Sequence, residues 1–263
     1  MDLPQPVTHD WLDALVEMTI SAQSNEFVVK RIERDAQQSL QRNADEPQMC
    51  WLVLAFVAFL RGDRDGFIRC AEAAHALANY DSMVLGNAAS LALNLGATDL
   101  AVKYARQLAA MKHGHVRMFL AAARALYGAT LFEEANAVMH SGNIQHALTE
   151  SDCFLVEMND LIASFQRSGV DPQTRMALLQ LASSTIRASG HAIRRTRSVR
   201  FPDHTVRYEF YIDQSASQCA NVNFAIAEAL TDEFDDAHPE LITFVCRPLA
   251  SFVPRGTSFE IAR

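Results

Sequence analysis

Hydrophobic residues recur every three or four positions through most of the chain, from Trp11 to Ile186. This spacing places apolar side chains along one face of an amphipathic helix. Asp171 followed by Pro172 is a favoured helix start, and Gly190 is a favoured helix end. The pattern therefore predicts helices or helical hairpins within residues 8–18, 26–41, 49–77, 83–111, 117–139, 154–165 and 172–190.

After Gly190 the hydrophobic period changes to two, which marks a second structural unit. Val206, Tyr208, Phe210 and Ile212 alternate with polar residues, as in a strand with one face in the core. We expect this strand to form a hairpin with the preceding one, followed by a helix and a last strand. The predicted segments are strands 193–201 and 206–212, helix 217–231 and strand 241–246, a small α/β domain of ββαβ order.

Three helical segments repeat at a spacing of 34 residues. Gly62 and Gly96 are 34 positions apart, and Ala55, Ala89 and Ala123 recur at the same interval. Small side chains let two helices approach closely, and glycine permits a tight reversal between them. Each hairpin then needs neighbours to bury its remaining apolar face. The spacing therefore favours a body built from stacked helical hairpins.

Residues 48–142 resemble the tetratricopeptide repeat (TPR) family. Trp51 and Leu54 match the start of its Trp-x-x-Leu-Gly motif, and the repeated glycines match its turn between helices. The chain departs from the family at Phe67, where alanine is preferred, and at Thr130, which replaces the glycine of the turn. The resemblance implies a mainly α fold, with a TPR-like helical-hairpin solenoid over residues 1–190 and a small α/β domain over residues 191–263.

In the TPR family the first helix of each repeat lines an inner groove that receives an extended peptide or a partner's helix. Carried onto this chain, the groove passes from apolar to polar and basic residues, which suits a hydrophobic anchor together with an acidic segment or a C-terminal carboxylate. Its apolar end has an alternative interpretation, packing against the N-terminal helices. The groove residues are Met49, Leu52, Phe56, Met83, Asn87, Ser90, Asn94, Arg117, Arg124 and Tyr127.

An arginine cluster lies in the predicted hairpin 191–207. Guanidinium groups pair with phosphates and with acidic partners, so the cluster is a candidate secondary basic patch. The alternative is a solvated or edge-strand face on which charge prevents unwanted pairing. The arginines concerned are Arg194, Arg195, Arg197, Arg200 and Arg207.

Composition narrows the class of protein. The 263 residues carry a formal charge of −8, which argues against a general nucleic-acid-binding surface. The start of the sequence shows no export signal, and the most apolar run, residues 49–60, is shorter than the roughly 20 residues that span a bilayer. Five scattered cysteines predict reduced thiols rather than a disulfide framework. We therefore expect a cytoplasmic protein with no membrane contact.

Motifs for catalysis, cofactors and metals are missing from the sequence. It contains no GxxxxGK[ST], GxGxxG, HExxH or GxSxG segment. His113 and His115 could ligate a metal, but a polar loop between repeats is the simpler interpretation, because no third ligand lies near them in the sequence. The acidic residues at 232–236 lack the spacing of a calcium loop. We therefore expect no catalytic site, no cofactor and no bound metal.

These observations favour a protein–protein interaction module, acting as an adaptor, chaperone or inhibitor, that binds another protein or peptide in the groove of the repeats. Two alternatives stay open. One is a nucleic-acid-associated regulator that uses the Arg-rich hairpin 191–207, and the other is an enzyme with a site between the two domains.

Overall fold

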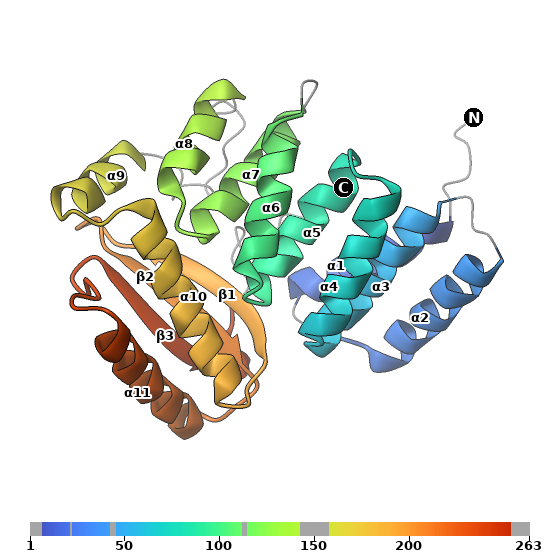
Figure 1. The fold of residues 1–263 in the computed structure, drawn as a ribbon. Coiled ribbons are helices and arrows are strands. Elements are labelled where there is room, and N and C mark those ends of the chain that lie inside the picture. Colours follow the sequence, from blue (N-terminus) through green and yellow to red (C-terminus); the bar gives the residue numbers. More distant parts are fainter. Residues whose placement is uncertain (1–6, 22, 43–45, 112–114, 143–157, 254–263) are drawn as a thin grey trace.

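The computed structural model describes residues 7–21, 23–42, 46–111, 115–142 and 158–253. Within these ranges the protein is mainly helical and carries a three-stranded sheet near the C-terminus, as the hydrophobic periods predict (Figure 1). The predicted helix at residues 154–165 is described only from residue 158 onward. His113 lies outside the described residues.

Three helical hairpins form the centre of the protein, and they correspond to the three repeating segments. The helices of each hairpin pack against each other, and α7 packs against both α5 and α6 of the hairpin before it. The helices are α3 (Pro47–Arg61) and α4 (Arg64–Leu77), α5 (Ser82–Asn94) and α6 (Thr98–Ala109), and α7 (Val116–Gly128) and α8 (Phe132–Ser141).

The reversal inside each hairpin uses a residue in the left-handed region. Gly62 has φ 73°, Gly96 has φ 65° and Thr130 has φ 65°, and the three stand 34 residues apart. Glycine adopts this conformation without a steric cost, whereas threonine does not. Thr130 therefore adopts the same left-handed conformation as the two glycines, although it is a threonine.

Two helices cover the first hairpin. Both α1 (Val7–Ser21) and α2 (Glu26–Gln41) pack against α3 (Figure 1). The side chain of Asn25 caps α2 by accepting hydrogen bonds from the backbone N–H groups of Phe27 and Val28. All of α3 from Met49 to Leu60 except Trp51 is buried, so this most apolar run is a core helix. No helix in the described part of the chain has the length and apolar character needed to cross a membrane.

The C-terminal part of the chain contains a sheet with helices on one face. Strands β1 (Ile193–Arg200) and β2 (Val206–Ile212) are antiparallel, and β3 (Ile242–Pro248) runs parallel to β2, which lies in the middle of the sheet. The crossover from β2 to β3 passes through α11 (Ala216–Glu233), and α11 packs against β3 (Figure 1).

The helix α10 (Pro172–Ala188) joins the two parts of the molecule. It packs against α11 and contacts β1, and it follows α9 (Met158–Arg167), which packs against α8. The predicted boundary at residue 190 therefore assigns α10 to one domain and α11, against which it packs, to the other. We use "C-terminal unit" below for α10 together with the sheet and α11.

One arginine of the C-terminal unit donates a hydrogen bond to a backbone carbonyl group at or near the reversal of each helical hairpin. Leu60 lies in the last turn of α3, where carbonyl groups lack intrahelical partners and favour a guanidinium group beside them. Gly96 and Thr130 lie in the turns that follow α5 and α7. This row of contacts docks the C-terminal unit along one edge of the three helical hairpins. The hydrogen bonds run from Arg194 Nη2 to Leu60 O (2.6 Å), from Arg187 Nη1 to Gly96 O (3.3 Å) and from Arg175 Nε to Thr130 O (3.0 Å).

Candidate functional site

The apolar end of the predicted groove is part of the core. Met49 is 3% exposed, and Leu52 and Phe56 are fully buried. Helices α1 and α2 pack against α3, so the face of α3 that the resemblance assigns to a partner is covered by the protein itself. The prediction that these three residues line an open groove is wrong, and their alternative interpretation, packing against the N-terminal helices, is the one that the structure shows.

The middle of the predicted groove is covered by strand β1. Asn87 and Asn94 are buried, and their Nδ2 groups donate 2.9 Å hydrogen bonds to the main-chain oxygens of Met83 and Ser90. Asn94 Oδ1 accepts a 3.1 Å hydrogen bond from the backbone N–H of Thr196 in β1. These asparagines are therefore not available as donors to a partner. Met83 and Ser90 are half-buried.

The basic end of the predicted groove is only partly accessible. Arg117 is exposed and Arg124 is half-buried, both on α7. Tyr127 is 2% exposed, and its ring centroid lies 5.0 Å from that of Phe132. Tyr127 is thus a core residue, which corrects its assignment to the groove, and the ten predicted residues do not form one continuous open surface.

The Arg-rich hairpin is divided between the interface and the sheet. Arg195 is 5% exposed, and its guanidinium carbon lies 4.5 Å from the ring centroid of Phe59. Burial, reinforced by the charge of Arg194, lowers the pKa of Arg195 to about 10. Neither Arg194 nor Arg195 lies on a solvated face, because both pack between β1 and the helices. Arg197, Arg200 and Arg207 are half-buried on the strands.

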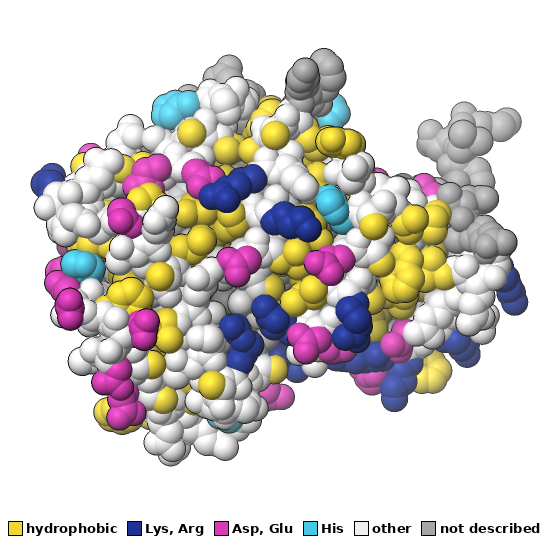
Figure 2. Space-filling view, viewed as in Figure 1, with side chains coloured by type: hydrophobic (Ala, Val, Ile, Leu, Met, Phe, Trp, Pro, Cys, Tyr) yellow, Lys and Arg dark blue, Asp and Glu magenta, His cyan; other side chains and the backbone are white. Residues whose placement is uncertain are grey.

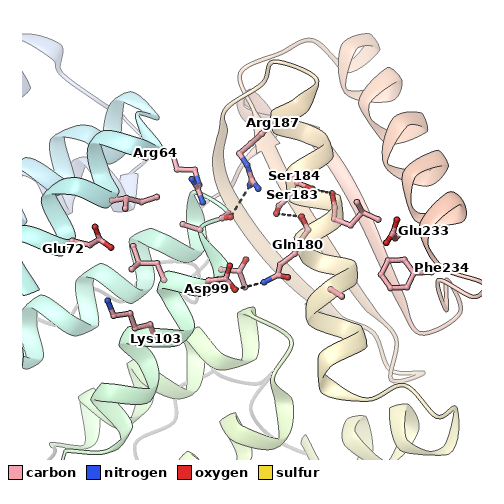
Figure 3. Close-up of a pocket in the computed structure, with 17 residues that line it drawn as sticks. Arg64, Glu72, Asp99, Lys103, Gln180, Ser183, Ser184, Arg187, Glu233 and Phe234 are labelled. Atoms are coloured by element: carbon pink, nitrogen blue, oxygen red, sulfur yellow. Dashed lines mark hydrogen bonds between the residues drawn. The ribbon is translucent and has the colours of Figure 1, made fainter.

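A cleft of about 770 Å³ lies between the helical hairpins and the C-terminal unit (Figure 3). We call it the inter-unit cleft. Side chains of both charges and several apolar side chains line it, and the space-filling view shows Lys and Arg together with Asp and Glu side chains around this hollow (Figure 2). From the helical hairpins its main lining residues are Arg64, Ile68, Glu72, Asp99, Leu100 and Lys103, and from the C-terminal unit they are Gln180, Leu181, Ser183, Ser184, Arg187, Glu233 and Phe234.

Two guanidinium groups meet across the cleft. Arg64, at the start of α4, and Arg187, near the end of α10, point toward each other from opposite walls (Figure 3). Burial lowers the pKa of Arg187, and the positive charge of Arg64 lowers it further. The ion pair of Arg64 with Asp65 is 3.6 Å long, and that carboxylate side chain is 80% exposed. The cleft therefore holds excess positive charge at this point, which would attract an anionic group.

Hydrogen bonds fix the polar wall of the cleft. Gln180 Nε2 donates to Asp99 Oδ1 at 2.6 Å, which ties α10 to α6 (Figure 3). The hydroxyl groups of Ser183 and Ser184 donate to carbonyl groups of their own helix, at 3.0 and 2.8 Å. Among the described lining residues there is no histidine or cysteine. The arrangement supplies donors and charge for binding, without a nucleophile placed beside a base.

Comparison of this chain with protein families, with curated proteins and with solved structures finds no significant match. The candidate site therefore rests on its own geometry. The charge pattern alone did not indicate the cleft, because Arg64 and Arg187 are 123 positions apart in the sequence and only the docking of α10 brings them together.

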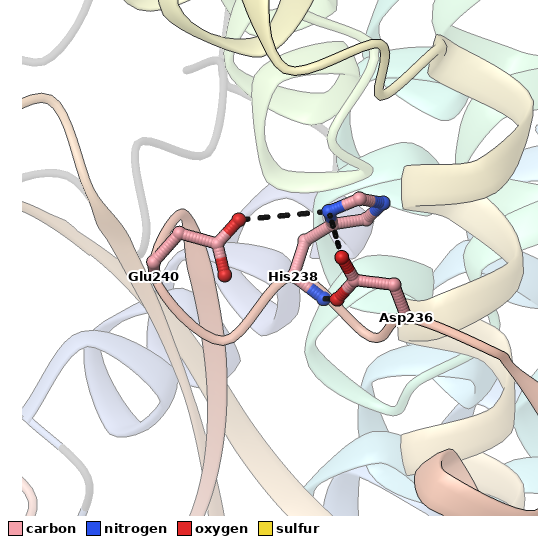
Figure 4. Close-up of side chains that lie close together, drawn as sticks. All are labelled: Asp236, His238 and Glu240. Atoms are coloured by element: carbon pink, nitrogen blue, oxygen red, sulfur yellow. Dashed lines mark hydrogen bonds and ion pairs between the residues drawn. The ribbon is translucent and has the colours of Figure 1, made fainter.

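Asp236, His238 and Glu240 lie close together in the loop before β3 (Figure 4). His238 Nδ1 is 3.3 Å from Asp236 Oδ2 and 3.6 Å from Glu240 Oε1. Asp236 Oδ1 also accepts a 2.8 Å hydrogen bond from the His238 backbone N–H, which forms a local turn. Asp236 and Glu240 are exposed, and local turn chemistry accounts for the grouping. His115, the described member of the other histidine pair, is exposed at the start of α7.

Proposed function

We propose that this chain is a protein–protein interaction module that binds an acidic segment, or the C-terminal carboxylate, of a partner in the inter-unit cleft. The single observation that carries the proposal is the convergence of Arg64 and Arg187 on one point of the cleft. Guanidinium groups pair with carboxylates through charge-assisted hydrogen bonds. A bound carboxylate would also relieve the mutual repulsion of the two arginines.

The apolar residues of the cleft support a peptide as the ligand. Ile68 and Leu100 contribute apolar surface from the repeats, and Leu181 and Phe234 contribute it from the C-terminal unit. All four are half-buried, so each leaves accessible surface for a hydrophobic anchor of the partner. A peptide offers both an apolar side chain and a carboxylate, and thus fits both features of the cleft.

The proposed function is still protein binding, as the sequence predicts, but the binding site is the inter-unit cleft instead of the groove of the repeats. We propose that the three hairpins belong to a TPR-like solenoid in a cytoplasmic adaptor, chaperone or inhibitor. In this protein α1 and β1 cover much of the face that would form the inner groove. The open surface is instead the junction where α4 and α6 face α10.

The alternatives receive less support. The enzyme hypothesis is not favoured, because the serine hydroxyl groups of the cleft are bonded to their own helix. The nucleic-acid hypothesis is weakened because Arg195 is buried against Phe59 and Arg194 is half-buried with a hydrogen bond to Leu60. A binding role without catalysis is therefore our proposal.

The proposal can be tested by selecting peptides with free C-termini from a random library against the wild-type protein and the Arg64→Gln/Arg187→Gln variant. An Arg34→Gln/Arg167→Gln variant is the matched control, since it removes the same charge at exposed positions outside the cleft lining. Thermal unfolding should first show that each variant is folded. We expect acidic peptides, or peptides with an acidic C-terminal end, to be enriched by the wild type and the control alone. Equal enrichment by all three proteins would refute the proposal.

A further inference from the structure

A buried carboxylate lies on the sheet face opposite α10 and α11. Glu209 belongs to the central strand β2, and its side chain is 3% exposed. Tyr211 donates a 2.6 Å hydrogen bond from its hydroxyl group to Glu209 Oε2. The Nε atoms of Arg207 and Arg247 lie 3.0 and 3.1 Å from the other carboxylate oxygen, Oε1. Arg207 Nε donates a hydrogen bond to this oxygen, whereas Arg247 Nε lies within ion-pair distance of it and makes no hydrogen bond in the described part of the chain.

A third arginine completes the cluster. Arg197 of β1 is the cross-strand partner of Glu209, just as Arg247 of β3 is the partner of Tyr211. Burial and the contact with Glu209 raise the pKa of Tyr211 to about 12, while the nearby charge of Arg197 acts in the opposite direction. Strand pairing therefore places three arginines around one cavity, and two of them form ion pairs with Glu209.

The charges in this cluster do not balance. Three arginines and one glutamate leave an excess of two positive charges, although one arginine would neutralise Glu209. Both ion pairs use Nε, so the Nη groups of Arg207 and Arg247 are left for another acceptor. In the described part of the chain, those Nη groups make no hydrogen bond to protein. The arrangement supplies more donors than its own carboxylate can accept.

A cavity of about 290 Å³ opens beside these donors. Its walls combine the charged cluster with the apolar side chains of Val199 and Val253. The ring of Phe201 lies 5.0 Å from the guanidinium carbon of Arg207, which further limits the movement of that side chain. The cavity, called the sheet cavity below, is thus a small space beside preorganised cationic donors.

We propose that the sheet cavity binds a tetrahedral oxyanion, the phosphoryl group of a phosphate monoester or inorganic phosphate. The planar fork of a guanidinium group matches the oxygens of a phosphoryl group, and the Nη groups of several arginines can bind different oxygens. Glu209 acts as the positioning residue, because its carboxylate accepts a hydrogen bond from Arg207 and forms an ion pair with Arg247. This site is separate from the inter-unit cleft, so the proposal does not depend on the function assigned to the cleft.

The full chain is titrated with inorganic phosphate at constant ionic strength, and binding is measured by isothermal titration calorimetry. Phenyl phosphate is titrated in the same way as a second probe. Two variants remove the site by different means. Arg247→Gln removes one guanidinium group, and Val199→Glu adds a negative charge to the wall without breaking an existing ion pair. Arg167→Gln, at an exposed position of α9, is the control.

We expect saturable phosphate binding that weakens about tenfold or more in both variants and is unchanged in the control. Tighter binding of phenyl phosphate than of inorganic phosphate would identify a monoester as the ligand, whereas the reverse order would identify the free anion. The absence of saturable binding of either probe to the wild type would overturn the proposal. Unchanged affinity in Val199→Glu, with its fold confirmed by circular dichroism, would also overturn it.

Discussion

Arg175 donates a 3.0 Å hydrogen bond from Nε to the main-chain oxygen of Thr130, the left-handed residue of the third hairpin. The Arg175 side chain is fully buried. Its Nη1 group donates to Val170 O at 3.0 Å, and its Nη2 group pairs with the carboxylate of Glu133. Burial lowers the pKa of Arg175, and Glu133 opposes this effect. One side chain thereby connects the last hairpin to α10.

Replacing Arg175 tests this connection. Arg175→Met should lower the free energy of unfolding by about 3–5 kcal/mol, because the Glu133 charge and two buried carbonyl groups lose their partner. Urea unfolding followed by circular dichroism measures the change. The control Arg167→Met removes an exposed arginine and should change the stability by no more than about 0.5 kcal/mol. Similar losses in the two variants would show that the buried contacts contribute little.

A pair of glycine substitutions tests the contact between β1 and the first hairpin. Gly62 and Gly190 both have positive φ, 73° and 80°, so alanine at either position should cost about 1–2 kcal/mol from backbone strain. A Cβ atom at Gly62 would also lie 2.8 Å from Arg194 Cδ, whereas nothing lies within 4 Å of one at Gly190. Gly62→Ala should therefore be the more destabilising substitution.

Urea unfolding of both glycine variants measures the difference. The additional loss in Gly62→Ala should largely disappear when Arg194 is also replaced by alanine, because the clash is with that side chain. An equal loss at the two glycines would contradict the docked position of Arg194.

The buried thiol of Cys246 predicts a pH dependence of stability. Burial, and then the neighbouring Cys219 thiol, raises the pKa of Cys246 from 9.0 to about 12. Because the folded-state pKa is above the unfolded one, the stabilisation is complete below pH 9 and is lost as the pH rises toward 12. Wild-type protein should therefore lose more unfolding free energy between pH 9 and pH 11 than Cys246→Ala does. Urea titrations at several pH values provide the comparison, and parallel pH profiles would count against this account.

The sequence predicts the elements of the fold better than it predicts their exposed faces. The hydrophobic period locates the helices and strands, and the 34-residue spacing locates the reversals at Gly62 and Gly96. Local chemistry sets these features. The burial of Asn94 depends instead on Thr196, which is 102 positions away, and no local pattern reports such a contact.

A run of charged residues in the sequence does not show whether those residues are exposed, because this also depends on contacts with distant parts of the chain. The run Arg194, Arg195 and Arg197 has the composition of a solvated strand, yet two of these arginines dock against the helices and Arg197 lines the sheet cavity. A guanidinium group can be buried when a helix end or an aromatic ring receives it. The positions of those acceptors become known only once the chain is folded.

We propose that partners bind in the inter-unit cleft rather than along α7. The most direct measurement is the dissociation constant of a selected acidic peptide for Arg64→Gln and for Arg117→Gln, by isothermal titration calorimetry. Both substitutions remove one arginine charge, but Arg64 lines the cleft, whereas Arg117 is an exposed residue of α7 outside its lining. We predict that Arg64→Gln weakens binding about tenfold or more, and that Arg117→Gln changes it by less than about twofold. Loss of affinity in Arg117→Gln with wild-type affinity in Arg64→Gln would contradict the account and return the site to the predicted repeat groove.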